Sequence, residues 1–365
     1  MKKSLVALAV LGAFAGVASA QSSVTLFGVL DVNARYVKNG DNNVKSLSTD
    51  GINSSRLGFR GVEDLGGGLK AGFWLEAGIN PDTGTTNTTV TGVSTNSKFF
   101  NRRSTLSLLG GFGELRLGRD YVPAFWNITI FDPFGTNGVG ALTNIYTGGA
   151  LSTAAATTLV RADNSIGYFL PSGLGGFYGQ AMVAAGEGQT LAQDNAAANP
   201  TQRANKHYGG RLGYAAGPFD VVAAYGQNQI TSNTDFKYYN FAGSWDFGFA
   251  KITGQYADME YTTVKNKLYQ LGLIVPLGAG EIHASYSAND GQGSLNGHNY
   301  NPDNAKQYAV GYLYNLSKRT AVYGTYAQIN NDGLQRSLVA PNPAVPASVL
   351  SVKSTGFELG LRHSF

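Results

Sequence analysis

The stretch GFELGLRHSF (356–365), which ends the chain, decides the fold. Phe357, Leu359 and Leu361 share one parity, whereas Glu358 and Arg362 share the other. Successive side chains of a β-strand point to opposite faces, so this strand is apolar on one face and polar on the other. Chain ends usually fray in water. The stretch therefore predicts a terminal strand that is paired within a sheet and lies against apolar surroundings.

The same two-residue alternation recurs along most of the chain. Tyr208, Leu212 and Tyr214 share one face of a segment, and Ile282 and Tyr286 share one face of another. Short Gly-rich turns such as EDLGGG (63–68) alternate with long polar stretches. We predict sixteen strands, at 24–37, 53–62, 69–80, 98–109, 114–121, 161–170, 177–186, 205–215, 219–227, 236–246, 249–260, 265–275, 281–289, 305–314, 319–329 and 353–365.

Two architectures suit an antiparallel meander with one apolar face, namely soluble stacked sandwiches and a closed barrel in an outer membrane. Strands of about ten residues match a tilted membrane crossing better than the shorter strands of soluble sheets. A closed sheet also leaves no unpaired edge in lipid. The prediction is an all-β fold, a 16-stranded antiparallel transmembrane β-barrel. Phe365 would pair with the first strand to close it.

The N-terminal segment 1–20 has the features of a secretory signal peptide. Lys2 and Lys3 precede an apolar run that ends in Ala18-Ser19-Ala20. A transmembrane anchor is the alternative, but the run is short and contains Gly12 and Gly16. Residues 21–365 would then form an exported barrel domain in the cell outer membrane.

Composition excludes several classes of protein. The chain has no Cys, and its net charge of +4 is too small to indicate nucleic-acid binding. The four histidines, at 207, 283, 298 and 363, show no metal-ligand spacing, and no nucleophile or phosphate-binding motif is present. We therefore expect no enzyme activity, no metal and no cofactor.

Several segments together resemble the general trimeric porins of Gram-negative bacteria, specifically the β-proteobacterial group. These are QSSVTLFGVLDVNARY (21–36), SRLGFRGVEDLGGGLKAGFWLE (55–76), FNRRSTLSLLGGFGELRLGRD (100–120) and RADNSIGYFLP (161–171). The C-terminal Phe resembles the assembly signal of outer-membrane barrels. His363 departs from the apolar or aromatic residue that family members often carry.

The resemblance implies a homotrimer of water-filled channels for passive diffusion of small hydrophilic solutes and ions. It implies outer-membrane lipid and lipopolysaccharide as surroundings, and the barrel-assembly machinery as a partner of the last strand. The third long loop, about 122–160, would fold into the lumen and narrow the pore. A channel specific for organic acids or phosphate is the alternative.

Odd–even alternation along each predicted strand indicates which side chains face the lumen. Arg102 has the lipid-facing parity, and we expect it at a rim of the barrel. The resemblance implies a constriction with basic residues on the wall and acidic residues on or near the loop. Opposed charges in a narrow passage bias ion occupancy, so we expect a weak to moderate anion preference. Each residue has a structural alternative: wall arginines could pair with carboxylates for rigidity, Glu76 could orient arginines, and Asp132 could cap its own loop. The basic candidates are Arg56, Arg103, Arg161, Arg60 and Arg35, and the acidic candidates are Glu76, Asp132 and Asp31.

Overall fold

The structure is a computed structural model. It describes residues 23–86, 98–146, 159–186, 206–231, 234–295, 297–299, 303–345 and 350–365. The predicted signal peptide lies outside the described residues. Among the described residues, no helix has the length and hydropathy of a membrane span.

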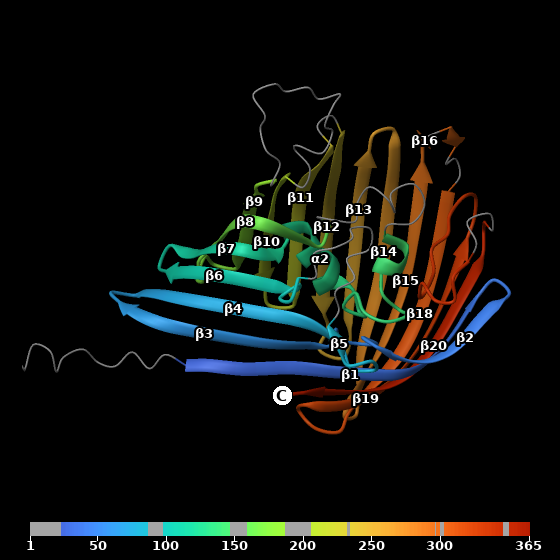
Figure 1. Cartoon of the computed structure of the whole chain (residues 1–365), viewed down its shortest axis with the longest axis horizontal. Helices are drawn as coiled ribbons and strands as arrows, with labels where there is room; N and C mark the ends of the chain where they lie inside the picture. Colours follow the sequence, from blue (N-terminus) through green and yellow to red (C-terminus); the bar gives the residue numbers. More distant parts are fainter. Residues whose placement is uncertain are drawn as a thin grey trace, which may run out of the picture.

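Sixteen antiparallel strands form a closed barrel (Figure 1), which confirms the predicted fold class. The strands are β1 Ser23–Asn39, β3 Arg56–Gly66, β4 Leu69–Asn80, β6 Arg103–Gly110, β7 Gly113–Tyr121, β8 Arg161–Phe169, β9 Phe177–Ala184, β10 Lys206–Ala216, β11 Phe219–Thr231, β12 Thr234–Asp246, β13 Lys251–Tyr261, β14 Val264–Leu277, β15 Gly280–Gln292, β18 Asp303–Asn315, β19 Thr320–Asn331 and β20 Lys353–Ser364.

The barrel closes between the first and the last strand. One part of β1 pairs with β3, and Val29–Asn39 pairs with β20 in antiparallel register. Phe365 completes the seam, because its backbone N–H and C=O both bond with Gly28 at 3.1 Å. Figure 1 shows the C-terminus beside β1 and β19. The terminal strand is therefore paired on both edges.

The loops opposite the short turns contain additional short strands. The stretch 39–52, expected as a loop, contains β2 (Asn42–Thr49), which pairs with the upper half of β1. The other short strands are β5 (Thr85–Thr86), β16 (Ser294–Leu295) and β17 (His298–Asn299). Such extra pairing extends the wall beyond the predicted strand ends.

Alternation divides the wall into an apolar outer face and a polar inner face, as expected for a membrane barrel with an aqueous lumen. On β15, Tyr286 is exposed on the outer face, whereas its neighbours Ser285 and Ser287 are buried on the inner face. On β14, Leu271 is exposed outside and Gln270 is buried inside. The exposed apolar side chains therefore form the lipid-facing surface of the barrel.

The turn between β3 and β4 shows why the sequence has three consecutive glycines there. Gly66, Gly67 and Gly68 have φ values of 84°, 62° and 81°. Side chains with a Cβ rarely adopt this left-handed region. The GGG run therefore allows a tight hairpin at the short-turn end of the barrel.

The loop between β7 and β8 folds into the barrel and carries two helices, α2 (Pro123–Phe131) and α3 (Thr143–Tyr146). Figure 1 shows α2 inside the ring of strands. Pro123 occupies the first turn of α2, where its missing N–H costs no hydrogen bond. The helix sequence PAFWNITIF is apolar around most of its circumference, which is typical of a buried helix.

Amide side chains on β12, β13 and β18 hold this loop in place. Asn240 of β12 donates to the Ala124 carbonyl at 2.9 Å, and Gln255 of β13 donates to the Ile128 carbonyl at 3.2 Å. Gln307 of β18 donates to the carbonyls of Gly140 and Ala141 at 2.9 and 3.0 Å. These bonds hold the loop backbone to one side of the lumen, so the passage lies on the other side.

Candidate functional site

A cavity of about 680 Å³ lies between the inner loop and the opposite wall. Its wall side is formed by side chains from β3, β4, β6 and β8 and the residues just before β6. Its loop side is formed by α2 and the residues that follow it. The lining includes four arginines, one carboxylate and one phenol, namely Arg56, Arg102, Arg103, Arg161, Glu76 and Tyr121.

Glu76 is the centre of the wall side. Its carboxylate accepts a hydrogen bond from Arg102 Nε at 2.5 Å and one from Trp74 Nε1 at 2.9 Å. Arg56 Nη1 lies 3.4 Å from the same carboxylate. Arg56 also donates to the Ser54 carbonyl at 2.8 Å. One carboxylate therefore orients two guanidinium groups.

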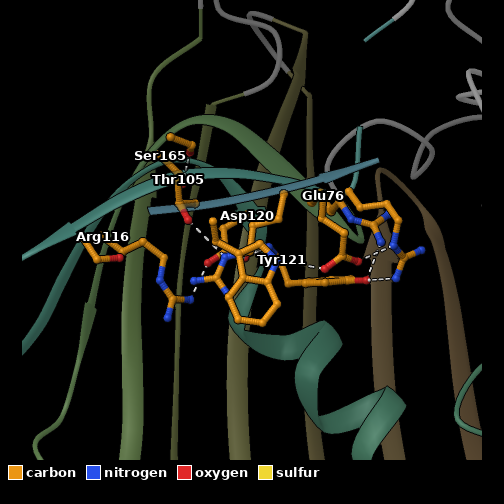
Figure 2. A network of polar contacts seen from close by, with 12 residues as sticks. Glu76, Thr105, Arg116, Asp120, Tyr121 and Ser165 are labelled. Carbon is orange, nitrogen blue, oxygen red and sulfur yellow. Dashed lines mark hydrogen bonds and ion pairs between the residues drawn. The ribbon is translucent and has the colours of Figure 1, made fainter. Parts of the chain in front are cut away.

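Tyr121 connects the wall to the loop. Its hydroxyl accepts hydrogen bonds from Arg102 Nη2, at 2.8 Å, and from Arg161 Nη2. Its ring lies parallel to the Phe125 ring of α2, with centroids 5.7 Å apart, and the Arg161 guanidinium is 4.2 Å from the Tyr121 centroid. Figure 2 shows Tyr121 between Glu76 and Asp120, above the helix.

Arg103 is directly opposite Glu76 across β4 and β6. Its Nε donates to Thr105 Oγ1 at 3.1 Å and is 3.8 Å from Asp120, while its guanidinium lies 4.5 Å from the Trp74 centroid. Asp120 is engaged more tightly by Arg116 Nη1, at 2.5 Å (Figure 2). The longer Asp120 distance leaves Arg103 only partly neutralised.

The cavity is positively charged. Four guanidinium groups, those of Arg56, Arg102, Arg103 and Arg161, face one carboxylate, Glu76, so the lining carries +3 (4 − 1). The Arg56 side chain is 23% exposed and the Glu76 side chain only 6%. The polar loop residues that line the cavity are neutral: Thr129, Thr136, Asn137 and Thr143. A diffusing ion would meet more guanidinium than carboxylate surface.

The structure places Asp132 away from the arginines, contrary to the prediction that it opposes them. Its carboxylate accepts hydrogen bonds from the backbone N–H groups of Phe134, Thr136 and Leu142, at 2.9 to 3.1 Å. Gln270 of β14 donates to it at 3.1 Å. Burial raises the pKa of the Asp132 carboxyl, and the hydrogen bonds oppose that rise. Asp132 therefore caps its own loop, which was the alternative interpretation of this residue.

Three further candidates also lie outside this cavity. Asp31 is buried and accepts hydrogen bonds from the backbone of Ile52 and Asn53, at 2.9 and 2.8 Å, so it shapes the segment before β3. Arg35 pairs with buried Glu358 at 3.0 Å, because their positions face each other across the β1–β20 seam. Arg60 lies closer to the short turns and lines a separate cavity.

The remaining candidates, Arg56, Arg103, Arg161 and Glu76, line the cavity together as the prediction grouped them. Arg102 was placed at a rim by parity, but the structure brings it to the lumen. Residue 102 precedes the first residue of β6, and its backbone N–H bonds to the Glu76 carbonyl at 3.1 Å. Side-chain alternation does not apply before the strand begins. The position of Arg102 next to Arg103 was therefore the one sequence feature that could indicate a lumen-facing Arg102.

The sequence matches the family model described as Gram-negative porin over residues 7–334. Outer membrane porin protein 32 of Delftia acidovorans is 38% identical over 380 aligned residues, covering 100% of both chains. An outer membrane porin protein of Bordetella pertussis is 29% identical, again over 100% of both chains.

Solved structures show the same fold. The anion-selective porin from Comamonas acidovorans superposes with a TM-score of 0.78 and 34% identity, over 94% of this chain and 100% of that chain. OmpT of Vibrio cholerae superposes with a TM-score of 0.65 and 16% identity, over 96% of this chain and 99% of that chain. The second likeness concerns the fold alone.

Proposed function

The chain belongs to the Gram-negative porin family and forms a channel in the outer membrane, and we propose that the arginine-lined cavity makes this channel moderately anion-preferring. Small hydrophilic solutes and ions would cross by passive diffusion through the lumen. No step of that process requires a catalytic residue or a cofactor.

The single observation that carries the anion preference is the charge of the cavity, four arginines against one carboxylate. Adding Arg116 with its partners Glu114 and Asp120 still leaves five positive against three negative charges, a net +2 (5 − 3). A charged ring with low-dielectric walls concentrates counter-ions in a pore. The 34% identity to a porin described as anion-selective supports the same sign. The relatives are described as porins, which does not favour a channel specific for organic acids or phosphate.

Purified protein in a planar bilayer tests this proposal. With a KCl gradient across the membrane, the zero-current potential should have the sign of chloride preference. Liposomes that contain the protein should swell in solutions of small uncharged sugars, because neutral solutes would diffuse freely through the channel. A potential with the sign of potassium preference would refute the anion assignment, and absence of swelling would refute the open channel.

We also propose a homotrimer, supported by an asymmetry of the outer surface. Exposed tyrosines mark β1, β8, β10, β11, β12, β14, β15, β18 and β19, including Tyr36, Tyr168, Tyr208, Tyr225, Tyr239, Tyr269, Tyr286, Tyr308 and Tyr326. On β6 and β7 the large exposed apolar side chains are leucines, including Leu106 and Leu117. Tyrosines gather where a barrel meets the lipid headgroups. The face without them would therefore be covered by neighbouring protomers.

Because the chain has no Cys, single cysteines give a clean test of that interface. Leu106→Cys and Leu271→Cys place thiols at side chains that are 59% and 60% exposed in one protomer. In native membranes a lipid-soluble maleimide should label position 271 and spare position 106. Equal labelling would contradict the proposed interface.

The remaining partners follow from location. Lipopolysaccharide would surround the tyrosine-bearing face, where Lys237 and Lys306 are exposed near the extracellular ends of β12 and β18. The barrel-assembly machinery would engage β20, which Phe365 follows to close the barrel. Both are proposals that rest on the position of these residues.

A further inference from the structure

The inner loop rests against the wall at its turn Pro133–Phe134, which follows α2. Two wall glycines make room for this turn. A Cβ on Gly272 of β14 would lie 2.4 Å from Pro133 Cγ, and a Cβ on Gly311 of β18 would lie 3.3 Å from Phe134 Cε1. His283 lies on β15, between these two strands, and is directly opposite Gly311. Gly272, His283 and Gly311 therefore form a seat for the turn.

The imidazole ring of His283 faces an oxygen atom with each of its two nitrogens. Nδ1 lies 2.6 Å from the Pro133 carbonyl oxygen, and Nε2 lies 3.0 Å from a carboxylate oxygen of Glu281. The Phe134 ring lies edge to face with the imidazole, with centroids 6.0 Å apart. The His283 side chain is 20% exposed, so it can exchange protons with the water of the lumen.

These two oxygen atoms determine which charge state of the ring fits the geometry. A neutral imidazole has one N–H donor and one bare nitrogen, whereas the protonated ring donates from both nitrogens. Neither a backbone carbonyl nor an ionised carboxylate supplies a proton. The protonated ring therefore makes both bonds, and each is stronger because the donor is charged. The neutral ring keeps one bond, at the strength of an uncharged donor.

Among the described residues, few other charges lie near this ring. The residues directly opposite His283 on β14 and β18 are Ile274 and Gly311, which are uncharged. Lys251 of β13 follows in the same row, beyond Ile274, about 10 Å from His283 by the strand spacing. In the loop, the Asp132 carboxylate is occupied by backbone N–H groups. The carboxylate on its own strand is therefore the charge next to the ring.

The turn continues into the part of the inner loop that lines the arginine-lined cavity. Gly135, Thr136 and Asn137 belong to this lining. Asn137 Oδ1 accepts a hydrogen bond from Ser54 Oγ, just before β3, at 2.7 Å, so the loop touches the opposite wall here. A turn that moves in its seat would therefore change the width of the passage.

We propose that His283 is a positioning residue that holds the inner loop as a cation, so that the loop is held more tightly at mildly acidic than at alkaline pH. Histidine changes its charge between about pH 5 and 8. As the pH rises through this range, His283 loses its proton, one of its two bonds is lost and the other weakens. The turn then moves more freely. This property belongs to the loop and does not depend on the sign of the ion preference.

Hydrogen–deuterium exchange of the turn tests the proposal without ion flow. Peptides from residues 132–142 are compared by mass spectrometry between the wild type and His283→Gln in detergent, at the same pH, so that the intrinsic pH dependence of exchange cancels. At about pH 5.5 the turn should exchange about fivefold faster in the variant, because a charged donor is replaced by a neutral one. At about pH 8.5 the two proteins should agree within about twofold, because both side chains are then neutral.

A second variant and a matched control isolate the proton. Glu281→Gln leaves the seat intact and should also speed exchange at the acidic pH alone, because the carboxylate that favours the charged ring is gone. His363→Gln is the control, because His363 is exposed on the outer face of β20 and bonds to Thr320 at 2.9 Å. It should leave exchange of the turn unchanged at both pH values.

Single-channel current noise gives the functional result. The wild type should be noisier at the alkaline than at the acidic pH, and His283→Gln should be equally noisy at both. If His283→Gln speeds exchange by the same factor at both pH values, His283 acts by packing alone and the proposal is overturned. Unchanged exchange at both pH values would overturn it as well. A cation-preferring channel that still showed this pH dependence would refute only the proposed selectivity.

Discussion

Replacing the central carboxylate should make the channel more anion-selective. Glu76→Gln keeps the shape of the side chain but only one acceptor oxygen. In the wild type, Arg102 donates to Glu76 Oε1 at 2.5 Å and Trp74 donates to Oε2 at 2.9 Å, so one of these two hydrogen bonds is lost in the variant. The variant changes the charge of the lining from +3 to +4, because Glu76 is its one carboxylate among the described lining residues.

The size of the effect follows from the distances. A unit charge about 4 Å from a permeating ion contributes about 1 kcal/mol in water, and less when the ion passes farther away. An interaction of about 0.5 to 1 kcal/mol acts on chloride and potassium with opposite sign, so the two free energies separate by about 1 to 2 kcal/mol. That corresponds to about a 5- to 30-fold change in the chloride-to-potassium permeability ratio. Screening at about 0.1 M salt reduces this only modestly, because the Debye length is about 10 Å.

The assay is the zero-current potential across a KCl gradient, with two controls. Glu63→Gln removes an exposed carboxylate seven residues beyond Arg56 on β3, about 23 Å away, and should leave the ratio unchanged. Glu76→Asp keeps the charge and should stay near the wild-type ratio. If Glu76→Gln leaves the ratio unchanged or lowers it, then Glu76 acts by orienting the arginines and the charge argument fails.

Two further changes test the loop and the seam. Asp132→Ala removes the acceptor of three backbone N–H groups, so the loop should lose on the order of 2 kcal/mol of stability and single-channel current noise should rise. Asp132→Asn should have a smaller effect, and a quiet current in Asp132→Ala would contradict the capping role. Gly28→Val should lower the yield of heat-resistant barrels in gels, because its Cβ would lie 2.3 Å from Phe365 Cζ and 2.7 Å from the Arg56 carbonyl oxygen. The matched Gly254→Val has open space around its Cβ, so equal yields of the two variants would argue against a tight seam.

The sequence predicted the wall well because a barrel wall obeys one simple rule. Alternation assigns Leu57 and Phe59 outward and Arg56 inward without knowledge of distant residues. The rule fails where alternation stops. Arg102 lies just before β6, and a register shift between β7 and β8 accompanies Asn164, whose φ is 53°. Next to this register shift, Asp163 pairs with Arg119 at 2.7 Å.

The loop was less predictable because its contacts join positions far apart in the sequence. Gln307 and Asn240, which hold the loop backbone, are separated from it by more than 100 positions. Nothing in the DPFG stretch (132–135) indicates that Asp132 bonds its own backbone and Gln270 and does not face the wall. The side of the lumen that a loop charge faces is a tertiary property. Single-sequence reasoning could therefore identify the wall arginines and Glu76 but not the position of Asp132.

The most direct test of the arginine account compares wild-type protein with the Arg56→Gln/Arg103→Gln/Arg161→Gln variant in a KCl gradient. The variant leaves one arginine, Arg102, and one carboxylate, Glu76, in the cavity lining, a net charge of zero (1 − 1). The wild type should give a chloride-preferring potential, and the variant should give a potential near zero. A potassium-preferring wild type, or a variant with the same potential as the wild type, would contradict this expectation.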